Sequence, residues 1–200
     1  TDYAYQGPLV SGATLGIWER APQSEERREQ TARLAGGSFT VDLPLKPLAD
    51  AATYEADYAL WSQRQMEAEA RGDATAARDA RALAERAKRW LARLQERPPG
   101  KTYPLGYSVY RMGDAVWVAT GGEPFSLLQS ELRRRFSHLA ILPSPVAGDM
   151  QMAYILPAAR YGAGLYQEEV ASLGPGSLEQ LIDAISARIS ELGGSSEIVL

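Results

Sequence analysis

The first quarter of the chain contains an alternating run of apolar and polar side chains. Residues 38–45 alternate with a period of two, which predicts a half-buried strand. Pro44 and Pro47 restrict this strand to a sheet edge or end it, because proline donates no hydrogen bond to a neighbouring strand. A charged segment at residues 24–34 predicts a short exposed helix, and the glycines at 36–37 are expected to end it.

The longest helical pattern covers residues 50–97. Two apolar faces follow one another along it, and Gly72-Asp73 lies between them. Gly72 can end the first helix and Asp73 can cap the second. The pattern therefore predicts an antiparallel helical hairpin whose tip lies in solvent.

Strand patterns dominate after Pro98-Pro99-Gly100, and residues 1–15 resemble loop or short strand. The predicted elements are strands at 107–111 and 115–120 joined by a turn at 112–114, a helix at 124–136 with Pro124 in its first turn, strands at 138–143 and 150–156, and a helix from a capping box at 177–180 to Gly193. Together the patterns predict an α+β fold, in which a mixed sheet packs with helices and the hairpin protrudes.

The composition is that of an ordinary globular protein. The 200 residues are 45% hydrophobic and 23% charged, and a chain of this length buries roughly 70% of its unfolded surface. We interpret residues 1–200 as a single domain or as the C-terminal part of a larger catalytic domain. The start at Thr1 instead of methionine indicates that a leader, a pro-segment or a larger part of the protein preceded it.

Several kinds of chemistry are excluded by residue counts. The chain has no cysteine and a single histidine, His138, so disulfides, thiolate zinc sites and any site with two imidazoles from this chain are excluded. The net charge of -4 argues against a nucleic-acid surface, and acidic residues interleave the eight arginines between 64 and 97, which is typical of a solvated helix face. No apolar run is long enough for a transmembrane segment.

Four side chains in the second half are candidates for chemistry. Glu123 follows a buried-looking strand and two glycines, so its carboxylate can bind a metal, act as a base or interact with the N-terminus of the next helix. Tyr154 lies in an apolar strand, where a tyrosine is usually part of the core. Tyr161 and Tyr166 lie in a loop interrupted by glycines, where they can act at a site or pack as a lid.

Short motifs occur within residues 101–193 in a defined order. They are Gly122-Glu123-Pro124-Phe125, Tyr154-Ile155-Leu156-Pro157, the pair Tyr161 and Tyr166, and Gly174-Pro175-Gly176-Ser177-Leu178. In order and approximate spacing this segment resembles the end of the catalytic domain of the neutral/alkaline ceramidase family. These are zinc amidohydrolases that cleave the N-acyl bond of ceramide, and their sphingolipid substrates are amphiphilic.

The resemblance implies a role for three residues. Glu123 and Tyr154 match the family's glutamate and tyrosine zinc ligands, and Tyr166 matches the tyrosine that hydrogen-bonds the reacting carbonyl oxygen. Zn²⁺ accepts carboxylate and phenolate oxygen, lowers the pKa of bound water to about 7 and polarises a carbonyl group. A tyrosine hydroxyl beside that carbonyl can stabilise the developing oxyanion.

The chain also departs from the family pattern. The family's histidine zinc ligands lie upstream, whereas His138 matches no ligand position and is interpreted as structural. Pro124 and Gln167 replace residues that are usual in the family, so the substrate can be a different amide or an ester. Zinc is therefore expected only with upstream ligands, and the isolated chain is expected to be inactive.

Three hypotheses follow. The first is the C-terminal portion of a ceramidase-like zinc hydrolase that acts on ceramide or a related lipid amide, with the upstream part of the domain as partner; the resemblance favours a secreted or periplasmic location. The second is a noncatalytic α+β scaffold or partner-binding module that uses the hairpin at 50–97 as its arm. The third takes Thr1 as a nucleophile with its own α-amine as base.

Overall fold

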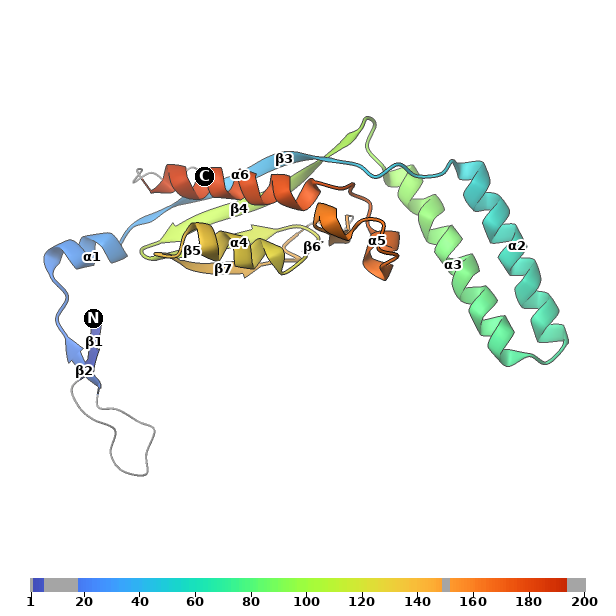
Figure 1. The fold of residues 1–200 in the computed structure, drawn as a ribbon, viewed down its shortest axis with the longest axis horizontal. Coiled ribbons are helices and arrows are strands. Elements are labelled where there is room, and N and C mark those ends of the chain that lie inside the picture. Colours follow the sequence, from blue (N-terminus) through green and yellow to red (C-terminus); the bar gives the residue numbers. More distant parts are fainter. Residues whose placement is uncertain (1, 6–17, 149–151, 194–200) are drawn as a thin grey trace, which may run out of the picture.

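The computed structural model of the protein describes residues 2–5, 18–148 and 152–193. It has the predicted α+β fold, in which helices cover a mixed four-stranded sheet and an antiparallel helical hairpin projects from one end (Figure 1). A small two-stranded ribbon lies at the other end, next to the first helix (Figure 1). Thr1, the nucleophile of the third hypothesis, lies outside the described residues.

The strands are β1 (Asp2–Tyr5), β2 (Trp18–Ala21), β3 (Leu34–Pro44), β4 (Thr102–Met112), β5 (Ala115–Thr120), β6 (Glu123–Pro124), β7 (Ala140–Ser144) and β8 (Tyr154–Ile155). The helices are α1 (Glu25–Thr31), α2 (Ala51–Ala70), α3 (Ala74–Glu96), α4 (Leu127–Arg135), the short 3₁₀ turn η1 (Ala158–Arg160), α5 (Tyr166–Val170) and α6 (Ser177–Leu192).

The main sheet has the order β3-β4-β5-β7 and separates a buried face from an open one. The first two pairings are antiparallel, and β5 pairs with β7 in parallel through the crossover helix α4. Along β4 every second side chain is buried, and α4 and α6 cover that face. The residues that form this core include Leu105, Val109, Val118, Leu132, Ile141, Leu181 and Ile185.

The opposite face of the sheet is uncovered by any described element. Tyr110 stacks on Trp117 there, with ring centroids 5.9 Å apart, and Leu142 beside them is 48% exposed. Since β3 is an edge strand that ends at Pro44, the prediction that prolines restrict this strand to an edge is confirmed.

The helical hairpin agrees with its prediction in detail. The Asp73 carboxylate accepts a hydrogen bond of 3.0 Å from the Ala76 amide at the start of α3, and Gly72 has the left-handed φ of 73° that the turn requires. Tyr54 of α2 stacks on Trp90 of α3 with ring centroids 6.1 Å apart. The interface between the helices is otherwise made by small side chains, chiefly the buried alanines of α3.

We expect the substitution Asp73→Ala to lower the free energy of unfolding by about 1 kcal/mol, because it removes the acceptor for the first amides of α3. Urea denaturation followed by circular dichroism measures the change. Asp57→Ala, in the exposed middle of α2, is the matched control and should change stability by at most about 0.5 kcal/mol. Equal losses in both variants would contradict a capping role for Asp73.

Several predicted boundaries are wrong for reasons of packing. The helix α1 ends at Thr31, and the glycines at 36–37 lie inside β3, where Gly36 allows close approach to β4. Pro124 belongs to β6, and α4 begins three residues later. His138 does not start a strand, because it is exposed in the turn before β7. Of the strand predicted at 150–156, only the two residues of β8 are extended, and residues 149–151 lie outside the described residues.

The predicted capping box at 177–180 is also wrong. The Ser177 hydroxyl donates a hydrogen bond of 2.7 Å to the Gly174 carbonyl instead of accepting one from an amide of α6. The Glu179 carboxylate accepts from the Ala158 amide at 2.9 Å, so it binds η1 and not the N-terminus of its own helix. No described helix is long and apolar enough to span a membrane.

Candidate functional site

Glu123 lies at the end of the main sheet, where the chain leaves β5 for a second, two-stranded sheet. Gly122 makes the turn with φ of 66°, and a Cβ there would lie 2.9 Å from the Ala153 carbonyl oxygen. The Glu123 amide donates to that same carbonyl at 2.7 Å. Glycine before Glu123 therefore lets the two segments approach closely enough to pair.

Tyr154 is the direct partner of Glu123 across the parallel pair β6–β8. Paired residues of neighbouring strands lie about 4.8 Å apart, and their side chains point to the same face. The next pair, Pro124 with Ile155, points to the other face, where Ile155 is fully buried in the core. Glu123 and Tyr154 are thus held side by side and half-buried on the face directed away from the core.

Tyr166 joins this pair from α5. Its ring contacts the ring of Tyr154 edge to face, with centroids 6.2 Å apart and an interplanar angle of 70°. The side chain of Tyr166 is 65% exposed. Among the described residues, the side chains of Glu123, Tyr154 and Tyr166 form no hydrogen bond or ion pair, so their oxygen atoms are free to bind a ligand.

Tyr161 has a different environment from Tyr166, although both lie in the same glycine-rich segment. Its hydroxyl donates to the Leu173 carbonyl at 2.8 Å. Burial, with added contributions from Glu168 and Glu179, raises the pKa of Tyr161 to about 12. Tyr161 therefore stays protonated and anchors its loop, and Tyr166 is the tyrosine of this segment that faces a possible substrate.

The donor set fits zinc in part. Carboxylate and phenolate oxygens are zinc ligands, and Glu123 and Tyr154 offer one of each on a single face. No group of three or more His, Asp or Glu side chains that could hold a metal ion occurs within the described ranges. Two donors leave a four-coordinate zinc shell half filled, so this segment can hold the metal only together with further ligands.

One feature next to the site was missed by the sequence analysis. Arg86, Arg89 and Arg93 follow one another on one face of α3 and line a pocket of about 210 Å³ together with Tyr166. The interleaved acidic residues led to the interpretation of a solvated helix face. The i, i+3, i+7 spacing of these arginines is the signal that they share a face, but only the tertiary structure brings α5 against it.

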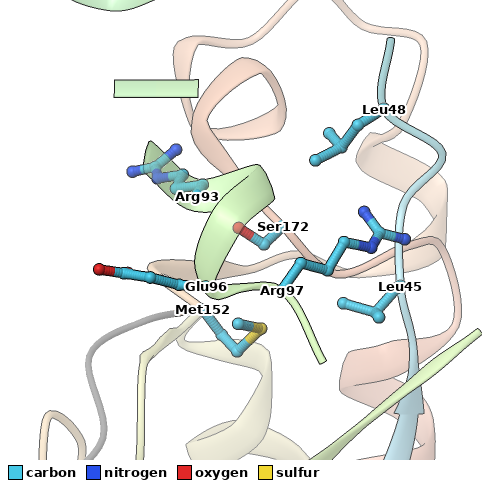
Figure 2. A pocket seen from close by; sticks show the side chains of 7 residues that line it. All are labelled: Leu45, Leu48, Arg93, Glu96, Arg97, Met152 and Ser172. Carbon is cyan, nitrogen blue, oxygen red and sulfur yellow. The ribbon is translucent and has the colours of Figure 1, made fainter. Parts of the chain in front are cut away.

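A second cavity lies where the C-terminal end of α3 meets the segment after β3, and its lining is shown in Figure 2. It is lined by Leu45, Leu48, Arg93, Glu96, Arg97, Met152 and Ser172. Its volume of about 20 Å³ is sufficient for one water molecule, which needs at least about 10–15 Å³. It is therefore a packing gap and not a site for a substrate.

Comparison of the chain with protein-family models, with curated proteins and with solved structures finds no match. The argument for function therefore depends on the residues described above and on the motif resemblance.

Proposed function

We propose that the chain forms the C-terminal portion of a ceramidase-like zinc-dependent hydrolase, which cleaves the N-acyl bond of ceramide or a related lipid amide. The observation that carries the proposal is the pairing of Glu123 with Tyr154 on one face, with the Tyr166 ring against Tyr154. The motif resemblance selected these three residues from sequence alone, and they are separated along the chain. Their proximity in space supports a common site.

Glu123 and Tyr154 would hold the metal, and the remaining ligands would be the histidines that the family carries upstream. Zinc, when bound, supplies a water of lowered pKa and polarises the substrate carbonyl. Since these two side chains leave their strands on the same face, they present both oxygen atoms to one point in space. The close approach at Gly122 keeps this arrangement rigid, as a metal ligand pair requires.

Tyr166 would donate a hydrogen bond from its hydroxyl to the carbonyl oxygen of the scissile amide. That oxygen gains negative charge when water adds to the carbonyl carbon, so a donor in this place stabilises the transition state more than the substrate. Two properties favour Tyr166 for this role. Its hydroxyl has no partner among the described residues, and the ring contact with Tyr154 holds it beside the metal ligand pair.

The test uses the protein with its native upstream sequence and a short-chain N-acyl sphingosine as substrate. We expect Tyr166→Phe to reduce kcat by about 100-fold with little change in zinc content, because it removes one donor to the oxyanion and no metal ligand. Initial rates and native mass spectrometry measure the two quantities. Tyr58→Phe, on the exposed surface of α2, is the matched control and should retain activity within about twofold. Absence of hydrolysis and of zinc in the unaltered protein would refute the proposal.

A second candidate function is a noncatalytic module that binds a partner through the helical hairpin. The observation in its favour is that Tyr58, Leu60 and Met66 of α2 are exposed on an arm that projects from the sheet (Figure 1). This candidate predicts that Tyr154→Phe leaves function unchanged, whereas the hydrolase predicts loss of zinc. The two outcomes separate the candidates in a single variant.

A further inference from the structure

We propose that the pocket between α3 and α5 binds a phosphate-like group carried by the substrate, so that the preferred lipid amide is one with an anionic headgroup. The assignment of this group to a substrate rests on the proposed function, whereas the anion site itself does not. We call this cavity the arginine pocket; it is lined by Arg86, Arg89 and Arg93 of α3, by Tyr166 and Glu169 of α5, and by Trp90 and Val170.

Positive charge exceeds negative charge in the arginine pocket. Three guanidinium groups line it, and Glu169 is the single carboxylate in the lining. Arg86 forms an ion pair with Glu169, which leaves the charges of Arg89 and Arg93 uncompensated by the lining. A bound dianion such as phosphate would balance these two charges.

The two remaining arginines are held differently. One Arg93 nitrogen donates to the Val170 carbonyl at 2.9 Å, and its guanidinium lies 4.8 Å from the centroid of the Trp90 ring. This fixes Arg93 in place but leaves further N–H groups for a ligand. Arg89 is exposed, and none of the described residues forms a hydrogen bond or ion pair with it. An anion would therefore meet one positioned guanidinium and one mobile guanidinium.

Repulsion between these cations favours an anion between them. Burial and the positive charge of Arg89 both lower the pKa of Arg93 from its ordinary value. The charges are therefore near enough to affect one another, and a bound anion would remove their mutual repulsion. Bidentate geometry makes arginine, more than lysine, suited to the planar faces of a phosphate group.

Tyr166 connects the arginine pocket to the candidate hydrolytic site. It lines the pocket and also contacts Tyr154, the partner of Glu123. A substrate with its anionic group among the arginines would thus have its amide next to Tyr166 and Tyr154. The volume of about 210 Å³ is less than the roughly 300–1,000 Å³ of pockets that enclose a whole drug-sized ligand, so the pocket suits a headgroup and not an acyl chain.

The experiment is isothermal titration calorimetry at low ionic strength with three probes: inorganic phosphate, a short-chain N-acyl phosphoethanolamine, and the same amide without its phosphate. We expect the phosphorylated amide to bind at least about tenfold more tightly than the unphosphorylated one. Arg89→Gln should weaken the binding of both phosphate probes about tenfold, since hydrogen bonds to charged groups contribute about 1.5–3 kcal/mol. Arg78→Gln, on the exposed surface of α3 outside the pocket, is the matched control and should change affinity less than twofold.

Each outcome has a defined meaning. Phosphate binding that is absent, or that is unaffected by Arg89→Gln and Arg93→Gln in folded protein, would overturn the anion site. Inorganic phosphate binding as tightly as the phosphorylated amide would show that the site takes a free anion, and would overturn the substrate assignment. Because the titration requires neither zinc nor turnover, Glu123→Gln should leave phosphate affinity unchanged, so failure of the hydrolase proposal is recognised separately.

Discussion

Replacing Glu123 with glutamine is expected to abolish hydrolysis and to lower the zinc affinity of the protein with its upstream sequence by at least about 100-fold. Changes in the outer shell of zinc sites already cost 10–100-fold in affinity, and a direct ligand contributes more. Glutamine keeps the size of the side chain but removes the negative charge. The backbone pairing with Ala153 and the register with Tyr154 involve no side-chain atom of residue 123, so the fold should remain intact.

Zinc content from native mass spectrometry, initial rates with a short-chain N-acyl sphingosine, and circular dichroism measure the three expected results. Glu55→Gln, an exposed glutamate of α2, serves as the matched control because it makes the same chemical change far from the site. If the Glu123 variant keeps both its zinc and its activity, Glu123 is not a ligand and the proposed function fails.

The substitution Gly36→Ala is expected to lower the free energy of unfolding by about 3 kcal/mol, near the upper end of the usual cost of overpacking. A Cβ at residue 36 would lie 2.3 Å from the Val109 carbonyl oxygen and 2.6 Å from the Tyr110 Cα. Both are backbone atoms of the paired strand β4, so no side-chain rotation can relieve the contact. For a chain of this length the melting temperature should fall by about 6–12 °C.

Gly106→Ala provides a control on the partner strand. Gly106 of β4 pairs with Thr40 of β3, and a Cβ there would meet no atom within 4 Å. Alanine is better than glycine inside a strand by about 0.5–1 kcal/mol, so this variant should be slightly more stable than the unaltered protein. Thermal unfolding followed by circular dichroism compares the two variants. A similar fall in both would mean that close approach at Gly36 does not limit the sheet.

The candidate site was partly predictable from sequence. The motif resemblance selected Glu123, Tyr154 and Tyr166 because short motifs preserve order and spacing along a chain. It could not distinguish the environments of Tyr161 and Tyr166, since both follow glycines in one segment. The difference arises from the Leu173 carbonyl, which accepts the Tyr161 hydrogen bond and comes from a later part of the chain.

The arginine pocket was not predicted, for a related reason. Alternating charges on α3 are typical of a solvated face, and most of that helix has one. The face that carries Arg89 and Arg93 becomes a pocket only because α5, at a distant position in the sequence, packs beside it. Neither element alone contains a signal for the contact.

The sequence by itself determined the features that depend on near neighbours. These are the hairpin with its Gly72-Asp73 junction, the edge strand ending at Pro44, and the α+β class, because periodicity, caps and prolines act over a few residues. Only the tertiary structure decided where Glu179 binds, why Gly36 must be glycine, and that Glu123 lies opposite Tyr154. Those features depend on backbone segments that meet from distant parts of the chain, and their contacts are set by packing of the whole sheet and its helices.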